Sequence, residues 1–197
     1  MKKIKKNFPG PLILIVGNSG SGKDSIIKGA VEKYPTDLRE IYLVKRYITR
    51  PPSETEDSIS VTPQEFKDIA NQNRFTLKWN IYGLDYGIPL EIDEWLAKGH
   101  PVLANVSRSI IDEAKQNYEN LKVVFVKVPL AVSIKRLKER AREKGKYLEE
   151  RIKRAKQMQD FSKADYIIDN SEKLEYAINQ FLNYLIEIEK LSQTIKK

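Results

Sequence analysis

The chain has 197 residues, a length that suits one domain with its own core, and it has no cysteine, which excludes disulfides and thiolate metal sites. Lys and Arg number 35 against 27 Asp and Glu, so the net charge is +8. The excess lies partly at the two ends and otherwise beside particular motifs, and no basic strand is interleaved with aromatic residues. We therefore expect no nucleic-acid partner. No run approaches the ~18 apolar residues of a membrane span, so we also expect no membrane contact and a cytoplasmic location.

The first elements surround a glycine-rich loop. Residues 11–17 are almost wholly apolar, which is typical of a parallel strand buried on both faces, and a helix is predicted from Lys23 to just before Pro35. Between them, in "GNSGSGKDS", Gly17, Gly22 and Lys23 fall where a phosphate-binding loop requires them. A glycine-rich turn without a ligand is the alternative, and the placement between strand and helix favours the phosphate site.

The whole loop is a candidate nucleotide site, because its backbone N–H groups and the following helix N-terminus suit a polyphosphate. The residues expected to bind the nucleotide are Gly17, Asn18, Ser19, Gly20, Ser21, Gly22, Lys23, Asp24 and Ser25. Asp24 stands where a Ser or Thr hydroxyl usually holds Mg²⁺. An acid there would repel phosphate unless a cation lies between them, so we predict that Asp24 binds Mg²⁺ with help from Ser25. Alternatively, Asp24 only caps the helix.

Strands and helices then alternate along the chain. We predict strands over 40–45, 101–106, 122–128 and 164–169, a hairpin over 74–79 and 84–88, and helices over 62–72, 91–99, 130–144, 147–161 and the C-terminal residues. Such alternation predicts an α/β fold with a parallel sheet and helices on both faces. No repeat or low-complexity linker marks a boundary, so we expect a single domain over 1–197.

The order of motifs resembles the guanylate kinase superfamily over about residues 11–182: the loop, "TRP", a "YG" segment, a strand with a polar end, "RLKER" and "DN". Within it, "GSGKDS", "RYITR", "LKWNIYGLDYG", "EIDEWL" and "VLANVSR" resemble the ribose 1,5-bisphosphate phosphokinase family, whose pattern includes a GKD loop. The resemblance implies a P-loop kinase fold with a five-stranded parallel core, an acceptor-binding insertion at about 46–90 and a helical lid at about 136–156. It also implies transfer of phosphate from ATP, with Mg²⁺, to ribose 1,5-bisphosphate, giving 5-phosphoribosyl 1-diphosphate and ADP in phosphonate catabolism.

Departures from true guanylate kinases fall in the acceptor region. Those enzymes carry a Glu that reads guanine before the position of Trp79, whereas this chain has Lys78, which offers only hydrogen-bond donors and is predicted to pair with a sugar phosphate. They also carry acids at the end of a core strand, where Asn105 and Ser107 stand here. One carboxylate is thus lost from the strand, and Asp24 is gained in the loop.

The resemblance assigns the acceptor residues. Arg50 matches the acceptor-phosphate arginine of the superfamily, and Arg46, Tyr86 and Arg108 are expected to line the acceptor pocket beside it. Each of these arginines could instead be a solvated surface residue, which is the commoner case. Their positions where strands end favour the pocket.

The resemblance also assigns the lid. Arg140 and Arg151, with Arg136 third, are expected to close over ATP and stabilise the transferring phosphoryl group. Arg154 is expected to belong to a salt-bridged, solvent-exposed face. Asn170 either contacts the adenine or only caps the last helix.

The implied chemistry needs no catalytic base. The acceptor atom is a phosphate oxygen, which is largely ionised at neutral pH because its second pKa is about 6. Positioning and charge neutralisation are therefore sufficient. A nucleoside monophosphate kinase and an inactive interaction module of the same fold remain as alternatives, and a homodimer is left open.

Overall fold

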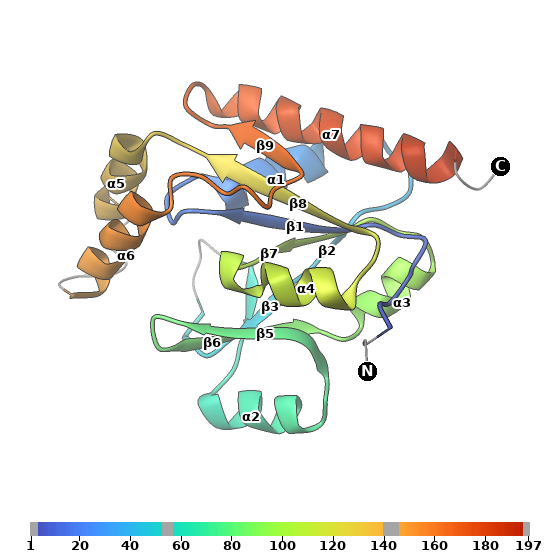
Figure 1. The fold of residues 1–197 in the computed structure, drawn as a ribbon, viewed down its shortest axis with the longest axis horizontal. Coiled ribbons are helices and arrows are strands. Elements are labelled where there is room, and N and C mark those ends of the chain that lie inside the picture. The colour runs from blue at the N-terminus through green and yellow to red at the C-terminus, as the bar shows by residue number, and fades with distance from the viewer. Residues whose placement is uncertain (1–3, 53–56, 140–145, 195–197) are drawn as a thin grey trace.

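The computed structural model describes residues 4–52, 57–139 and 146–194, which fold into two sheets with helices around them (Figure 1). The larger sheet has five strands in the order β2-β7-β1-β8-β9, and every neighbouring pair is parallel. Its strands are β1 (Leu12–Gly17), β2 (Tyr42–Leu43), β7 (Val102–Asn105), β8 (Leu121–Lys127) and β9 (Tyr166–Asp169). This confirms the predicted α/β fold with a five-stranded parallel core.

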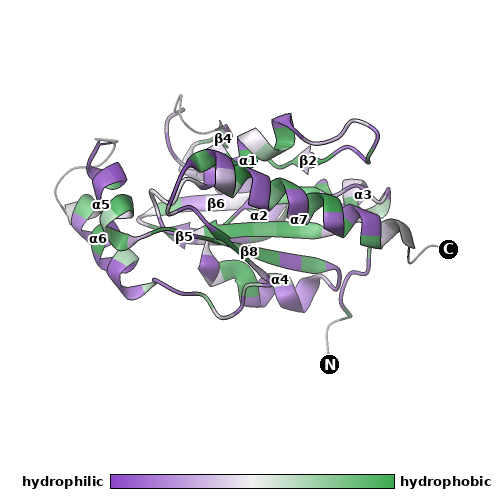
Figure 2. Ribbon diagram, turned by 90° about the horizontal axis from the view of Figure 1, so that it is seen from above, coloured by the Kyte–Doolittle hydropathy of each residue, from purple (hydrophilic) through white to green (hydrophobic). Residues whose placement is uncertain are grey.

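Both faces of this sheet are buried, as the apolar run in β1 predicts. Leu12 and Leu14 face one core, whereas Ile13 and Ile15 face the other. The second core is closed by two helices that are far apart in the sequence, α1 (Lys23–Glu32) and α7 (Leu174–Thr194). In Figure 2, α7 alternates between hydrophobic and hydrophilic residues along its length, which is the pattern of a helix buried on one side.

The first core is covered by short elements and by the smaller sheet. The short elements are α3 (Ile92–Ala97), the 3₁₀ turn η1 (Arg108–Ile110) and α4 (Ile111–Asn117). No element was predicted from the sequence between β7 and β8, so η1 and α4 are additions. Helix α4 begins without a side-chain cap and is not followed by a glycine, so it lacks the end signal that Gly99 gives to α3.

The smaller sheet lies within the stretch predicted as the acceptor-binding insertion. Its order is β4-β3-β6-β5, with β3 and β4 parallel and the other pairs antiparallel. Its elements are β3 (Arg46–Ile48), β4 (Ser58–Ser60), α2 (Pro63–Asn71), β5 (Phe75–Ile81) and β6 (Leu84–Pro89). The hairpin and the capping box of α2, made by Thr62 and Glu65, are confirmed. Strands β3 and β4 have three residues each, and the sequence did not predict them.

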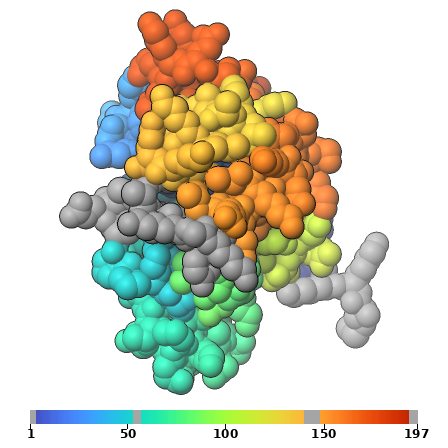
Figure 3. All heavy atoms as spheres, turned by 90° about the vertical axis from the view of Figure 1, so that its left-hand side faces the viewer, coloured from blue at the N-terminus to red at the C-terminus, as the bar shows by residue number. Residues whose placement is uncertain are grey.

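Two helices project at one end of the molecule, α5 (Leu130–Glu139) and α6 (Lys146–Gln157). Figure 3 looks at this end and shows the two helices, in yellow and orange, side by side above the smaller sheet, in cyan and green. They follow β8 and precede β9, so they stand at the carboxyl ends of the parallel strands, where α/β proteins bind ligands. Among the helices of the described ranges, none is both long and apolar enough to cross a membrane.

Candidate active site

The loop between β1 and α1 is held tightly against its neighbours. Gly20 and Gly22 have φ values of 80° and 87°, in the left-handed region that favours glycine. A Cβ added at Gly22 would lie 2.5 Å from Nδ2 of Asn170, so a larger residue would also collide there. The first N–H groups of α1 lack partners within the helix, and together with this loop they make an anion-binding site.

Lys23 closes the loop from the first turn of α1. Its ammonium donates to the carbonyl oxygens of Gly17, at 2.9 Å, and Asn18, at 3.0 Å. The positive charge is therefore held at the mouth of the loop, beside the site where the outer phosphates of a nucleotide would lie.

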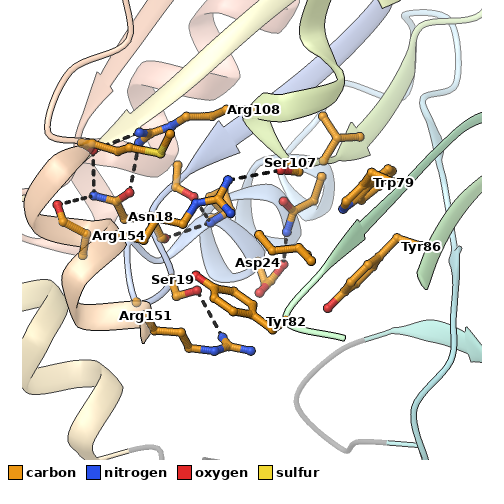
Figure 4. A pocket seen from close by; sticks show the side chains of 18 of the residues that line it. Asn18, Ser19, Asp24, Trp79, Tyr82, Tyr86, Ser107, Arg108, Arg151 and Arg154 are labelled. Carbon is orange, nitrogen blue, oxygen red and sulfur yellow. Dashed lines mark hydrogen bonds between the residues drawn. The ribbon is translucent and has the colours of Figure 1, made fainter. Parts of the chain in front are cut away.

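A pocket extends from this loop towards the smaller sheet (Figure 4). Among its described lining residues are six cationic side chains and a single carboxylate, that of Asp24. The six cations are Lys23, Arg46, Arg50, Arg108, Arg151 and Arg154. Such an excess of fixed positive charge suits a ligand with several anionic groups.

The far side of the pocket, which we call the acceptor wall, comes from the smaller sheet and the residues beside it. It consists of Arg46, Arg50, Trp79, Ile81, Tyr82 and Tyr86. The rings of Trp79 and Tyr86 are stacked, with centroids 5.3 Å apart and planes 3° from parallel. The guanidinium of Arg46 lies 5.9 Å above the Tyr86 ring, and Arg46 is only 9% exposed. The acceptor wall therefore combines a flat aromatic surface with cations.

One face of α6 supplies two more cations. Arg151, Arg154, Ala155 and Met158 recur at helical spacing, and all four line the pocket. Arg151 donates to Oγ of Ser19 in the loop, at 3.1 Å, and Arg154 donates to the hydroxyl of Ser107 after β7, at 3.4 Å. These contacts hold α6 over the phosphate-binding loop.

Arg108 ties the end of α6 to the loop. Its guanidinium donates to the carbonyl oxygen of Met158, at 2.9 Å, and to Oδ1 of Asn18, at 3.2 Å, and it lies 4.7 Å from the ring centroid of Phe125. Burial, with a smaller effect of the nearby Arg154, lowers the pKa of Arg108 to about 10. A cation at the C-terminal end of a helix is also favourable to the helix dipole. Arg108 therefore supports the pocket from behind as well as lining it.

Asp24 accepts a hydrogen bond from the side-chain amide of Asn105, with Oδ1 and Nδ2 2.7 Å apart. Gly22 is the N-cap of α1, and the Asp24 carboxylate points into the pocket, where it meets the end of β7. The described residues contain no cluster of three or more carboxylate or imidazole ligands. A single carboxylate suits Mg²⁺, which commonly takes one or two protein carboxylates and completes its shell with water and substrate phosphates.

A second hollow shares Gly20 and Gly22 with the pocket and is also lined by Ser25, Arg136 and Asn170. Asn170 is 1% exposed, and its Nδ2 donates to the carbonyl oxygen of Ser21 at 2.8 Å. Its Oδ1 makes no hydrogen bond within the part of the chain that the structure describes. Because α7 begins four residues later and the Asn170 side chain bonds to the loop, Asn170 does not act as its cap.

Comparison with known proteins agrees with this geometry. The guanylate kinase family matches residues 10–188. Among curated proteins, the ribose 1,5-bisphosphate phosphokinase PhnN of Pseudomonas paraeruginosa is 38% identical over 178 residues, which cover 89% of this chain and 95% of the relative. The protein of that name from Bradyrhizobium diazoefficiens is 34% identical, and the match covers 90% of this chain and 88% of the relative. The chain belongs to the ribose 1,5-bisphosphate phosphokinase family.

The fold of this ribose 1,5-bisphosphate phosphokinase family member is also that of a solved guanylate kinase. The crystal structure of the enzyme from Anaplasma phagocytophilum superposes with a TM-score of 0.66 at 17% identity, covering 93% of this chain and 88% of that one. At this identity the likeness concerns the fold alone.

The structure brings most of the predicted residues of this family member together. Arg46, Arg50, Tyr86, Arg108 and Arg151 gather at the pocket with the predicted loop residues, except Ser21, which is buried, and Ser25. Arg136 and Asn170 lie at the second hollow instead, where Arg136 donates to the carbonyl oxygen of Gly20 at 3.4 Å. Arg140 lies outside the described residues.

Two further predicted residues, Lys78 and Ser25, do not reach the pocket either. Lys78 is exposed on the face of β5 opposite to Trp79, because side chains alternate along a strand, so it is removed from the acceptor residues. Ser25 is exposed at the second hollow, whereas Asp24 points into the pocket, so the two residues do not share one metal position. Successive residues in the first turn of a helix point about 100° apart, which explains this separation.

Several residues that line the pocket were not predicted from the sequence, and Arg154, Trp79 and Tyr82 are those with a charged or aromatic side chain. Arg154 was expected on a solvent-exposed face, yet it lies one helical turn from Arg151 and faces the loop. The spacing of the two arginines could have revealed this. Trp79 and Tyr82 had no assigned role; Trp79 reaches the acceptor wall from β5, and Tyr82 reaches it from the turn that follows.

Proposed function

We propose that this protein transfers the γ-phosphoryl group of ATP to ribose 1,5-bisphosphate, forming 5-phosphoribosyl 1-diphosphate and ADP. The observation that carries the proposal is the charge of the pocket, in which six cations and one carboxylate lie between a phosphate-binding loop and an aromatic wall. ATP and a bisphosphate bring many ionised oxygens together, and their transfer chemistry depends on fixed positive charge. The activity named for the curated relatives supports the same acceptor.

On the nucleotide side, the loop and Lys23 are proposed to hold the phosphates of ATP. Arg151 and Arg154 contact Ser19 and Ser107 at the edge of the loop, so they are suited to neutralise charge on the transferring group. The buried Oδ1 of Asn170 is an acceptor at the second hollow, and the exocyclic amine of adenine is a donor that it can pair with.

On the acceptor side, Arg46 and Arg50 are proposed to bind the phosphates of the bisphosphate, and the rings of Trp79 and Tyr86 to pack against the sugar. Guanine would present N–H donors, which need acceptors. The described acceptor wall contains no carboxylate, since Asp24 belongs to the loop. This composition argues against a guanylate kinase.

The reaction needs one bond to form and one to break. An oxygen of the acceptor 1-phosphate attacks the γ-phosphorus, and the bond between that phosphorus and the β–γ bridging oxygen breaks, so that ADP leaves with the electron pair. The attacking oxygen is already largely ionised at neutral pH, so no residue has to remove a proton. The arginines around the pocket then orient the two anions and offset their repulsion.

Asp24 is the proposed protein ligand of Mg²⁺, because it is the one carboxylate among the described pocket residues and Asn105 orients it. When bound with ATP, the ion neutralises charge on the nucleotide phosphates. Ser25 faces the second hollow, so it is not retained as a metal ligand.

The proposal is tested by an ADP-release assay on the purified protein, with ribose 1,5-bisphosphate, GMP and dGMP as separate acceptors. We expect rapid ADP release with the ribose compound and a value of kcat/KM at least about 100-fold lower with either nucleotide. Efficient phosphorylation of GMP together with no use of the ribose compound would overturn the proposed acceptor.

A further inference from the structure

Tyr82 has a backbone conformation that an L side chain disfavours. Tyr82 and Gly83 form a two-residue turn between β5 and β6, where Ile81 pairs with Leu84, and their φ values are 55° and 73°. Two positive φ values are typical of a type I′ turn, in which Asn is preferred at the first position because larger side chains crowd the backbone. A strained residue at a binding pocket suggests that its side chain makes a contact whose benefit offsets the cost of the strain.

That contact is with the arginines of α6. The guanidinium carbon of Arg151 lies 4.8 Å from the centre of the Tyr82 ring, and that of Arg154 lies 6.0 Å from it, both within the range of cation–π attraction. Figure 4 shows the ring beside the Arg151 side chain at the edge of the pocket. Burial raises the pKa of Tyr82, although Arg154 and Arg151 oppose that shift, so the phenol is neutral at physiological pH.

The ring joins two parts of the protein that carry different substrates. Tyr82 belongs to the acceptor wall, whereas Arg151 and Arg154 reach Ser19 of the loop and Ser107 beside it. Arginine side chains have several rotatable bonds, and a flat ring against two of them restricts their positions before the substrates bind. The charged residues Lys78 and Asp85 of the same hairpin do not line the pocket. The hairpin therefore contacts Arg151 and Arg154 through the uncharged side chain of Tyr82.

We propose that Tyr82 is a positioning residue, which uses its ring to hold Arg151 and Arg154 over the phosphate-binding loop and so links the acceptor wall to α6. This role rests on the proposed function, in which these two arginines neutralise the transferring phosphoryl group. Among the described residues, the ring of Tyr82 is the aromatic group that lies against both arginines.

The test compares Tyr82→Asn with Tyr82→Phe. Asn suits the type I′ turn and removes the ring, so its melting temperature should equal or exceed that of the wild type while kcat falls roughly tenfold. Phe keeps the ring and the strain, so it should retain a kcat at least about five times that of the Asn variant. KM for the acceptor should change less than about threefold in both, because the arginines that bind it are untouched.

Three results would overturn the role. A kcat of Tyr82→Asn equal to that of the wild type would show that the ring is not needed. An equal loss in both variants would assign the effect to the hydroxyl, and a rise in acceptor KM alone would make Tyr82 a substrate-binding residue. If the Asn variant proved unstable, the same substitution in an Arg151→Lys background decides. Lys lacks the planar guanidinium that stacks on a ring. If the Tyr82 ring acts through Arg151, replacing Tyr82 in this background should therefore lower kcat much less than it does in the wild type.

A second measurement does not depend on the acceptor. With a non-hydrolysable ATP analogue alone, tryptic cleavage within α6 should be faster in Tyr82→Asn than in the wild type and Tyr82→Phe, because α6 loses its contact with the hairpin. Equal cleavage in all three proteins overturns the positioning role. Failure of the wild type to use ribose 1,5-bisphosphate, with the cleavage difference still present, would count against the proposed function only.

Discussion

On the nucleotide side of the pocket, the phosphate-binding loop and the start of α1 form one continuous stretch, residues 17–24, whereas the acceptor wall on the other side comes from β3, β5, β6 and the residues beside them. We propose that the loop holds phosphate mainly with its backbone, and the positive φ values of Gly20 and Gly22 give the chain its shape there. The acceptor wall relies on side chains, above all Arg46 and Arg50. We therefore expect the backbone of the loop to accept polyphosphates in general and the side chains of the acceptor wall to select the second substrate.

The largest expected effect comes from the cation of the loop. Lys23→Met removes the charge that Gly17 and Asn18 hold at the loop mouth, and transfer should fall about 10³-fold with an unchanged circular dichroism spectrum. Lys28→Met is the matched control, because Lys28 is on the same helix and its side chain is 78% exposed, so the rate should stay within about twofold. If Lys23→Met kept an activity near that of the wild type, the charge of Lys23 would not be needed for phosphoryl transfer.

The acceptor wall should respond in KM instead. Arg46→Met and Arg50→Met each remove a charged contact to the acceptor, and KM for ribose 1,5-bisphosphate should rise about 10- to 100-fold while KM for ATP changes little. Arg74→Met, an exposed arginine before β5 and outside the pocket, is the control on the same sheet. Steady-state kinetics with each substrate varied in turn measures the difference. Equal increases in KM for ATP and for ribose 1,5-bisphosphate would contradict the proposal that the acceptor wall binds only the acceptor.

Asp24 tests how the loop differs from the usual Ser or Thr pattern. Asp24→Asn should lower metal affinity about tenfold, read from Mn²⁺ binding in the presence of ADP by electron paramagnetic resonance as well as from the Mg²⁺ dependence of activity. The double variant Asp24→Asn with Asn105→Asp exchanges the two hydrogen-bonded partners and should recover part of that affinity. An unchanged metal affinity in the single variant would mean that Asp24 does not hold the ion.

Arg108 lies where the two sides of the pocket meet. The sequence predicts that it binds the acceptor, whereas its hydrogen bonds in the structure indicate that it supports α6 and the loop. As an acceptor ligand it would control acceptor KM, whereas its bonds to Met158 and Asn18 predict loss of kcat. We expect Arg108→Met to lower kcat about tenfold and the melting temperature by about 5 °C, since two hydrogen bonds from a partly buried cation are lost. A change confined to acceptor KM would restore the ligand assignment.

The smallest effect concerns the stability of the smaller sheet's helix. The backbone N–H and hydroxyl of Thr62 lower the pKa of Glu65 in the capping box of α2. A lowered folded-state pKa means that the stabilisation is present above the unfolded pKa and disappears as the pH falls through the folded one. The melting temperature of Glu65→Gln should therefore lie slightly below that of the wild type, by less than about 2 °C, at pH 7, and the two should converge near pH 3. A difference that persists at low pH would mean that the carboxylate charge is not its cause.

Much of the fold could be predicted from the sequence, because the signals that mark its strands, helices and turns are local. The apolar run of β1, the glycine pattern of the loop and the Thr62–Glu65 capping box each act over a few neighbouring residues, and all three are confirmed. Strand β4 was missed because three residues hold too little pattern to recognise, and α4 was missed because no cap or glycine marks its ends.

A phosphate-binding loop between a strand and a helix could be predicted from the sequence, because one contiguous stretch carries all its parts. Which arginines share a pocket depends on the three-dimensional fold, since Arg46, Arg108 and Arg154 come from segments more than 40 residues apart. It also turned Lys78 away from the pocket and Trp79 towards it, through the pleat of a strand whose burial depends on the rest of the fold. Local geometry is encoded by neighbours, whereas the direction of a side chain across a pocket depends on packing that joins distant parts of the chain.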